Sequence, residues 1–546
     1  MKIKPLILSV TFCLISLLLF TKAQSQEVWE NYRNEIYSYL SIMAQKGLIE
    51  FDDIIQPITR SKINEALKTL NNQKEKLSSL EKKELAFYVE EYAVINTSTS
   101  THLFKNDENR RWRLFSASNR ESNATLFVDP IVQIGKNTGN NNISFTNKSI
   151  GINCWGTIGK HIGFQFYGND ITLSGTGGDT NAILNSAPGY VKQSDSGNHQ
   201  TVNYSDVRAS VTYGWKNGSV SFGQDYLLWG YGENGRMVLS DKSPTYPYIR
   251  LDYRPFKWLQ FNYIHAWLNS NMVDSSKTYS YYNTVYGGHR IYYIPKYMAS
   301  HSVNIKFNKN FDVSIGESII YSDQLNVGYL IPLMFFKVYD NIKSNGNILA
   351  GDNGQFFFQF NSRNWIKKTH IYAGLLIDEI RITKIFTDSN RNQLGLNLGI
   401  SATDILIPHL TVTADYTRIN PFVYNNLNPV QTYTSYGFNL GDWMGNNFDR
   451  FILSAKYAPF PKANVYIRYQ YIRKGGAGTA LQQYFVPEPP LLFDYQYSQS
   501  DCLAQFSYQP VHNVYLRAYL NYANQKRVNA ASISQHSAGI TFSYGL

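Results

Sequence analysis

Hydrophobic and polar residues alternate along most of this chain, beginning at about Asn123. In the segment Leu394–Ser401 every second residue is Leu or Ile, and the residues between them are Gly, Asn or Ser. The segments 410–417, 465–471 and 514–521 repeat the pattern with other residues. A period of two puts successive side chains on opposite faces of a β-strand, so each segment predicts a strand with one apolar and one polar face.

The last strand of the chain is especially informative. Residues 539–546 alternate Ile, Phe, Tyr and Leu with Gly, Thr and Ser, and no polar tail follows them. A membrane β-barrel needs such a strand, because its last strand must pair with the first and leave no open edge in lipid. An apolar last residue with Tyr544 two positions before it also resembles the C-terminal signal read by the barrel-assembly machinery. We therefore expect residues 539–546 to close a barrel against a strand around Ala124–Ile134.

The connections between the expected strands are short at one end and long at the other, as in barrels with periplasmic turns and extracellular loops. Asn217-Gly218 is a strong hairpin signal, because a type I′ turn needs positive φ at both central residues. Eight short turns lie near residues 159–161, 216–219, 254–257, 309–310, 366–368, 406–409, 459–463 and 510–513. The long connections, rich in Asn, Gly, Ser and Tyr, span residues 168–204, 269–296, 322–354, 418–449 and 473–500. With the N-terminal domain on the short-turn side, these turns predict about 18 strands.

The chain begins with the pattern of an export signal. In residues 1–25, Lys2 and Lys4 precede the apolar run Leu6–Phe20, which is long enough for a signal peptide and short for a membrane-spanning helix. We expect cleavage near Gln26. A retained N-terminal membrane anchor is the alternative.

Residues 26–100 have helical periodicity and predict three short helices. The first ends at Gly47, the second is capped within 59–61, and the third begins with a capping box formed by Ser78 and Glu81. They are expected to form a soluble plug or periplasmic domain, or else a helical linker without a compact core. Residues 101–122 are expected to be a linker, and residues 123–546 the barrel.

Composition favours a barrel over a soluble β-sandwich or propeller, which also alternate. Charged residues are 17% of the chain and aromatic residues 15%, with 42 Tyr, whereas soluble domains carry about 25% charged residues. Tyr suits membrane–water interfaces, because its ring is apolar and its hydroxyl polar. Beyond the signal peptide only Cys154 and Cys502 occur, which leaves one disulfide bridge open. The expected fold class is mostly β: a transmembrane antiparallel β-barrel of about 18 strands preceded by a small α-helical periplasmic domain.

The net charge of +11 directs attention to the lumen. If apolar faces contact lipid, six basic residues point inward: Arg208, Arg250, Lys306, Lys456, Arg468 and Arg517. Rings of cations favour the passage of anions. Alternatively, these residues form an internal salt-bridge network with Asp252, Asp312 and Asp415. The sequence leaves both readings open, and with them whether the lumen is plugged.

We find no specific catalytic or metal-binding motif, such as G-x-S-x-G, H-E-x-x-H or a Cys-based metal spacing. The residues His265, His289, His301 and His370 near strand ends are expected to be hydrogen-bonding residues, and Asp378-Glu379 a hydrated loop junction. We therefore expect no enzyme, no cofactor and no metal. Loop aromatics that suit sugar stacking, or else loop packing and an interfacial girdle, are Tyr279, Tyr281, Tyr282, Tyr286, Trp443 and Tyr484.

Residues 222–251 go beyond a general barrel pattern. Their core, G-x-D-x-x-x-W-G-x-G-x-x-G-x-x-x-L-S, precedes a proline-bearing stretch and a new strand. This core resembles the Wzi-like capsule assembly family. Four further segments are similar to other regions of that family: residues 54–63, Tyr329–Pro332, Gly351–Asn353 and Gly374–Glu379.

The resemblance implies a large, non-enzymatic outer-membrane barrel with a helical bundle that holds capsular polysaccharide at the cell surface. The residues carried over as motif or binding candidates are Asp225, Trp229, Gly230, Gly232 and Gly235. Related barrels in gliding bacteria imply an alternative role in surface motility or adhesin secretion, and the inward cations imply an anion-preferring pore as a third hypothesis. Expected partners are outer-membrane lipid, capsular or exopolysaccharide, motility or secretion proteins and the barrel-assembly machinery, but no nucleic acid. The long loops are expected to be extracellular and the helical domain periplasmic.

Overall fold

The computed structural model describes residues 27–546 except 94–97, 108, 110, 141, 180–184, 194–199, 282–287, 345–350, 380–392 and 480. The expected signal peptide and its cleavage site near Gln26 lie outside the described residues, as do Tyr282 and Tyr286. Across the described ranges, every helix is too short or too polar to cross a membrane.

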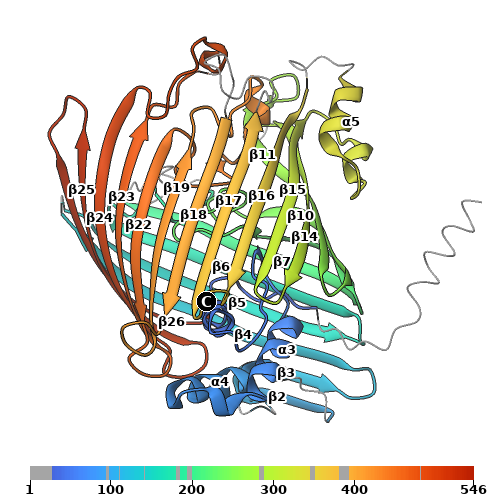
Figure 1. Ribbon diagram of the computed structural model, residues 1–546. Helices are drawn as coiled ribbons and strands as arrows, with labels where there is room; N and C mark the ends of the chain where they lie inside the picture. The colour runs from blue at the N-terminus through green and yellow to red at the C-terminus, as the bar shows by residue number, and fades with distance from the viewer. Residues whose placement is uncertain are drawn as a thin grey trace, which may run out of the picture.

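Eighteen strands of the described residues form a closed antiparallel barrel, in which each strand pairs with its neighbours in chain order (Figure 1). This confirms the predicted fold class. The strands are β4 (Ala124–Gly139), β5 (Ser144–Ile158), β6 (Ile162–Thr176), β7 (Thr201–Trp215), β8 (Gly218–Asp225), β10 (Tyr246–Phe256), β11 (Leu259–Val273), β14 (Tyr293–Asn308), β15 (Phe311–Ser322), β16 (Asn353–Arg363), β17 (Thr369–Glu379), β18 (Gln393–Thr403), β19 (Leu410–Ile419), β22 (Phe448–Tyr457), β23 (Ala463–Gly475), β24 (Tyr495–Tyr508), β25 (Val514–Arg527) and β26 (Ile533–Tyr544).

All eight predicted short turns join consecutive strands at one end of the barrel, which we call the turn end. The turn between β7 and β8 is the tight hairpin that Asn217-Gly218 predicts, since Trp215 pairs with Gly218. Longer connections gather at the opposite end, the loop end. The additional elements of the long connections are β9 (Leu228–Trp229), β12 (Tyr279–Tyr281), β13 (Gly288–Arg290), η2 (Val327–Leu330), α5 (Phe336–Lys343), η5 (Pro429–Gln431), β20 (Thr434–Ser435), β21 (Phe438–Asn439) and η6 (Gln482–Tyr484).

The alternating sequence sorts side chains between the two faces of the wall. On β18, Leu398 and Ile400 are 46% and 47% exposed on the outer face, whereas Asn397 and Ser401 are buried on the inner face. β23 and β26 repeat this arrangement, with Ile467 and Ile540 exposed outward. An apolar outer belt and a polar interior are the pattern of a barrel that contacts lipid.

The last strand closes the barrel on β4, as predicted, but with a different partition of the pairing. The segment Ser537–Tyr544 pairs with Val132–Gly139 in the loop-end half of β4. The turn-end half, Ala124–Val128, pairs instead with a strand outside the ring, β3 (Trp112–Asn119), which forms a hairpin with β2 (Ser100–Asn106). Residues 101–122 are therefore not the linker that we expected, since they carry most of this hairpin. β26 is too short to pair with the turn-end half of β4, and β3 pairs with that half instead.

The N-terminal residues fold into helices α2 (Ile36–Gln45), α3 (Arg60–Asn71) and α4 (Ser79–Tyr92), with the short elements β1 (Ile55–Gln56) and η1 (Lys74–Lys76). Gly47 follows α2 with a φ of +73°, and the capping box of Ser78 and Glu81 begins α4, both as predicted. Residues such as Ile36, Leu67 and Leu85 form a buried apolar cluster shared by the three helices. The domain thus has a core of its own, which contradicts the alternative of a helical linker.

The helical domain sits in the turn end of the barrel (Figure 1). The Gln45 side chain of α2 donates to the Lys368 carbonyl at 3.0 Å, and Glu84 of α4 accepts the Lys462 amide at 3.0 Å. The Phe87 ring stacks on His512 at 3.6 Å between centroids. The short turns therefore form the contact surface for the domain, since they contain Lys368, Lys462 and His512. Cys154 and Cys502 are both free, so the bridge left open by the sequence is absent.

Candidate functional site

Residues 226–245, which we call the crossing segment, leave β8 and enter the lumen. There β9 pairs antiparallel with β1 of the helical domain, and the Gly230 amide donates to the Ile54 carbonyl at 2.8 Å. Around this contact lies an apolar cluster that includes inward-facing wall residues such as Tyr248 and Phe357. A barrel loop and the N-terminal domain therefore meet inside the barrel and fill this part of the lumen together.

The tip of the crossing segment reaches the opposite wall. The Glu233 carboxyl accepts hydrogen bonds from Ser454 on β22 at 2.7 Å and from Tyr466 on β23 at 2.8 Å. The Asn234 side chain donates to Gln470 on β23 at 2.8 Å. In the ring of described strands β22 stands nine places from β8, which is half the circumference. Burial raises the pKa of the Glu233 carboxyl above its usual range.

A second loop, residues 420–447, holds the crossing segment in place, and we call it the locking loop. Its Asp442 carboxylate receives two hydrogen bonds from Arg450, at 3.0 and 2.7 Å, and both side chains are fully buried. The Trp443 indole donates to the Asn234 carbonyl at 2.7 Å, and the Tyr424 hydroxyl donates to the Met237 carbonyl at 2.6 Å. Polar groups of the crossing backbone are thus satisfied by side chains of the locking loop, which makes the two loops one packed unit.

The glycines of the crossing segment are required by this packing. Gly235 has a φ of +146°, and a Cβ there would lie 2.4 Å from an Asp442 oxygen. A Cβ on Gly232 would lie 1.9 Å from the Gly235 carbonyl oxygen. Gly230 has a φ of +92° and faces the Gln359 side chain. Only glycine adopts the backbone conformations of Gly230 and Gly235 without strain, and only glycine leaves room for the close approach at Gly232.

The predicted binding candidates mostly lie in the protein interior. Trp229 is 1% exposed, Asp225 5% and Trp443 6%. Asp225 accepts hydrogen bonds from the Tyr226 amide at 2.8 Å and from Gln165 at 3.3 Å. The structure brings Trp229 and Trp443 into one buried cluster inside the barrel, whereas Asp225 bonds to β6 of the wall. Tyr484 belongs to η6, and its side chain lies outside the description.

Three of the six predicted lumen cations hold the helical domain. Arg250 donates to the Pro57 carbonyl at 3.1 Å and lies 4.0 Å from the centre of the Trp29 ring. Lys306 pairs with Glu50 at 3.0 Å, and Lys456 pairs with Glu35 at 3.2 Å. These contacts could not be predicted from the barrel sequence alone, because their partners come from another domain.

The other three cations have partners in the wall. Arg208 lies 3.7 Å from the centre of the Tyr167 ring, Arg468 is 3.4 Å from Asp501, and Arg517 lies 5.4 Å from the centre of the Tyr515 ring. Of the predicted acidic partners, Asp252 pairs with Arg250 at 2.8 Å. Asp312 instead accepts from Asn361, and Asp415 from Tyr372 and Asn397. Of the three acidic partners that the second reading expected, only Asp252 therefore pairs with a predicted cation, and the helical domain supplies carboxylates that the reading did not include.

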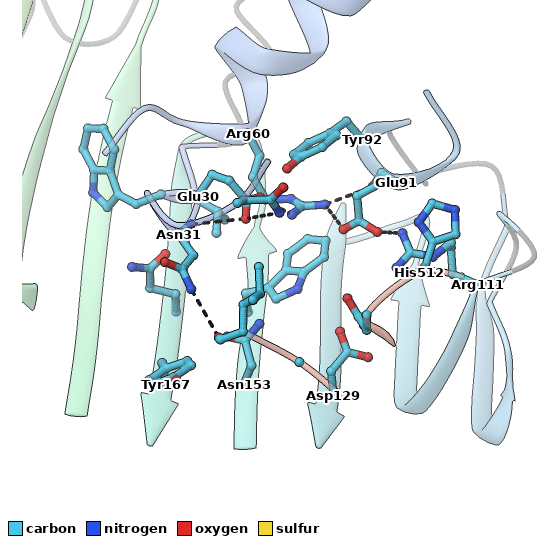
Figure 2. Close-up of a pocket in the computed structure, with 18 of the residues that line it drawn as sticks. Glu30, Asn31, Arg60, Glu91, Tyr92, Arg111, Asp129, Asn153, Tyr167 and His512 are labelled. Atoms are coloured by element: carbon cyan, nitrogen blue, oxygen red, sulfur yellow. Dashed lines mark hydrogen bonds and ion pairs between the residues drawn. The ribbon is translucent and has the colours of Figure 1, made fainter. Parts of the chain in front are cut away.

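A polar pocket of about 90 Å³ lies between the helical domain and the wall (Figure 2). Figure 2 shows Arg60 between Glu30 and Glu91, at 2.5 and 2.6 Å, with Arg111 also directed at Glu91. The last residue of the chain takes part, since Asn31 donates to the Leu546 carbonyl at 3.2 Å. This pocket suits a few water molecules, whereas a second pocket of about 880 Å³, between the helical domain and turn-end residues such as Arg254 and Lys306, is within the roughly 300–1,000 Å³ of ligand pockets.

The β12–β13 hairpin exposes an aromatic and basic cluster at the loop end. The Tyr279 side chain is 45% exposed, and its ring lies 6.3 Å from the Tyr292 ring in a stacked orientation. The Arg290 guanidinium lies 5.0 Å from the centre of the Tyr292 ring. Rings beside a cation suit a sugar polymer with acidic groups. Of the hairpin's other predicted aromatics, Tyr281 has a side chain outside the description.

The histidines and carboxylates weighed as catalytic groups have structural contacts. His370 shares a hydrogen bond with Asn361 at 2.8 Å, His265 with the Tyr321 hydroxyl at 2.8 Å, and His289 with Ser280 at 2.6 Å. Asp378 accepts the Tyr424 amide at 2.6 Å and so anchors the locking loop. Within the described ranges, His, Cys, Asp and Glu side chains form no group of three or more that could hold a metal ion.

Comparison with known proteins identifies the fold. No protein-family model matches the chain, and no curated protein matches its sequence. The solved structure of Wzi from Escherichia coli, an outer membrane protein involved in group 1 capsule assembly and a carbohydrate-binding β-barrel, superposes with a TM-score of 0.58. The match has 14% identity and covers 96% of this chain and 100% of that one.

Two Pseudomonas aeruginosa barrels are less similar. OccK3 has a TM-score of 0.41 at 12% identity, over 77% of this chain and 95% of its own. OpdK, solved with vanillate, has a TM-score of 0.44 at 10% identity, over 77% and 98% of the two chains. TM-scores this low do not establish a common fold with this chain. The likeness to Wzi includes nearly the whole sequence, so the protein has the fold of the Wzi outer-membrane β-barrel, as the motif resemblance predicted.

Proposed function

We propose that this protein is a non-enzymatic outer-membrane barrel whose loop end faces outward and binds or organises surface polysaccharide, with the helical domain in the periplasm. The observation that carries the proposal is the meeting of the crossing segment and the helical domain inside the lumen. A wall whose interior is occupied from both ends offers its loop-end surface, rather than a channel, as the place for a large ligand. The likeness in fold to Wzi, described as a carbohydrate-binding barrel involved in capsule assembly, supports the same role.

The arrangement of the inward cations supports this role over an anion-preferring pore. Lys306 and Lys456, which would line an anion path, pair with Glu50 and Glu35 of the helical domain. Arg250 pairs with Asp252 in the wall. Cations that are already neutralised by fixed carboxylates provide little excess field to select anions.

The β12–β13 hairpin is the proposed contact for the polysaccharide. Tyr279, Tyr292 and Arg290 combine apolar ring faces with a guanidinium at an exposed position of the loop end. Ring faces pack against the apolar faces of sugars, and the guanidinium pairs with carboxylates of an acidic polymer.

The test is a deletion strain complemented with the wild-type gene or with the double variant Tyr279→Ala and Tyr292→Ala. We expect deletion to release polysaccharide from the cell surface, and the purified double variant to bind that polysaccharide roughly tenfold more weakly, a loss of about 1.4 kcal/mol. Tyr253→Ala is the matched control, because Tyr253 is 41% exposed near the turn end. A deletion strain with normal attached polysaccharide but defective surface spreading or adhesin display would instead support motility or secretion.

A further inference from the structure

The outer face of the barrel carries polar side chains where lipid is expected. The cross-strand pairs Tyr263–His301 and His301–Glu317 lie on β11, β14 and β15. These residues alternate with Ile264, Met298 and Ile320, which belong to the cluster inside the lumen. Tyr263, His301 and Glu317 therefore point outward, away from the lumen, in the wall of the barrel.

The height of these residues places them within the lipid-facing belt. Phe307, which is 63% exposed near the turn end, lies six residues from His301 on β14. At about 3.4 Å per residue and a tilt of about 40°, six residues rise by roughly 15 Å. The apolar belt of such barrels is about 25 Å tall, so His301 and Glu317 lie above its middle, toward the loop end.

Residues 325–343, which we call the strap, cover this polar patch from outside. Glu317 accepts the Phe336 amide at 3.0 Å and the Lys337 amide at 2.5 Å, which fixes the start of α5 against β15. The Phe336 ring lies 4.5 Å from the His301 ring, and Tyr263 donates to the Tyr329 carbonyl at 2.8 Å. Figure 1 shows α5 beside β15, outside the barrel wall and toward the loop end.

Most apolar side chains of the strap point away from the wall, although Tyr329 and Phe336 pack against it. Asp340 is 1% exposed and accepts the Asp352 amide at 2.9 Å, whereas Val327, Leu333 and Ile342 are 71%, 82% and 73% exposed. The other exposed apolar side chains of the strap are Leu325, Ile331, Phe335 and Val338. A helix on a water-exposed surface has the opposite pattern, and an apolar patch of this extent marks contact with a membrane or a partner.

We infer that the strap lies in the outer leaflet and that lipid acyl chains cover its exposed apolar side chains. The strap is continuous with the lipid-facing belt, since Phe335 contacts Phe356 of β16 at 5.8 Å between rings and Phe358 is exposed beside it. It replaces a polar part of the wall by an apolar surface, and the hydrogen bonds within η2 and α5 satisfy backbone groups that would otherwise be unpaired in lipid. The inference rests on the barrel spanning the membrane with its loop end outward, and not on polysaccharide binding.

Spin labels on single cysteines test this inference in protein reconstituted into liposomes of outer-membrane lipid. Cys154 and Cys502 are first replaced by Ser, and labels are placed at Val327, Leu333 or Ile342. Label at Leu398, on the outer face of β18, is the lipid control, and label at Ser276, in an exposed loop-end connection, is the water control. Heat-modifiable gel migration selects the folded variants.

We expect the three strap labels to collide more with oxygen than with a nickel chelate, as the label at Leu398 does, and the label at Ser276 to show the reverse. Collisions dominated by nickel at the strap would place it in water and overturn the inference. Low collision rates with both reagents would also overturn it, because protein, from a second copy or another partner, would then cover the strap. Polysaccharide binding affects neither readout, so failure here leaves the proposed function standing.

Discussion

The buried pair of Asp442 and Arg450 offers a direct test of the plugged lumen. Both side chains are fully buried, and Arg450 donates two hydrogen bonds to the carboxylate. The variant Asp442→Ala leaves the Arg450 guanidinium inside the lumen without its counter-charge. Removing one partner of a buried ion pair costs about 3–5 kcal/mol.

This loss of stability should affect the crossing segment and the locking loop, and not the barrel wall. The backbone hydrogen bonds that join β22 to its neighbouring strands do not involve Asp442, whereas the crossing segment is held by neighbours of this residue, such as Trp443. A loss of about 3–5 kcal/mol raises the equilibrium for local opening by roughly one hundred-fold to several thousand-fold. The crossing segment should therefore open far more often, while the eighteen described strands stay closed.

Amide hydrogen exchange read by mass spectrometry measures this opening. The Trp229 and Leu239 amides bond each other's carbonyls at 3.0 and 3.4 Å, so peptides from residues 226–245 report on the crossing segment. Peptides from β18 should keep wild-type exchange. The variant Asp274→Ala is the matched control, because Asp274 forms its ion pair with Lys277 in an exposed loop.

A double variant that removes both charges separates the effect of the unpaired charge from the effect of side-chain shape. In the double variant Asp442→Leu and Arg450→Met no charge is left unpaired, and exchange in residues 226–245 should return most of the way to the wild-type rate. Unchanged exchange in Asp442→Ala would refute the argument that this pair locks the crossing segment. Equal loss in the single and double variants would show that shape, and not charge, holds the loops.

Four further outcomes are expected. Planar-bilayer recording of the wild-type protein should show no steady conductance, because the crossing segment spans the lumen and packs against the helical domain, and Asp442→Ala should add flickering openings. Ser78→Ala should cost about 1 kcal/mol of helix stability through loss of the capping box of α4, and faster proteolysis of residues 78–92 would report it. Removing residues 544–546 should block membrane insertion, seen as lost heat-modifiable migration, because β26 then pairs less with β4 and Asn31 loses the Leu546 carbonyl. Burial lowers the pKa of Lys462 to about 8, below the ordinary value of 10.5, so the docked domain binds fewer protons than the undocked one. Docking should therefore strengthen as pH rises from 8 to 10, which would be measured as increasing resistance of the helical domain to protease. The variant Lys462→Met should remove this pH dependence.

The wall of the barrel could be predicted from the sequence because its rules are local. Alternation assigned Leu398 and Asn397 to opposite faces, and Asn217-Gly218 marked its hairpin, since each signal depends on a few neighbouring residues. The β2–β3 hairpin was missed because residues 101–122 lack regular alternation. It is an edge hairpin that pairs with only half of β4, and its buried residues, Arg113, Ser116 and Ser118, are polar, so no apolar alternation marks it.

The site could be predicted only in part, because its contacts join segments far apart in the chain. The motif glycines were found, but Gly235 is explained by Asp442, about two hundred residues later, and Trp229 by its place beside Ile55. Lys306 and Lys456 were placed in the lumen, yet their partners, Glu50 and Glu35, belong to another domain. No local pattern contains such pairs.

One signal of the strap was present in the sequence. His301 and Glu317 occupy positions that alternation assigns to the lipid face, where an uncovered charged side chain destabilises a barrel. Such residues require either a break in the pattern or a cover, and the long connection after β15 supplies the cover. The same reasoning applies inside, where the polar wall receives the helical domain and the crossing segment. Both faces of the wall are thus used to hold protein, which agrees with the proposal that the loop-end rim, with Tyr279 and Arg290, is the part of the barrel that meets a large external ligand.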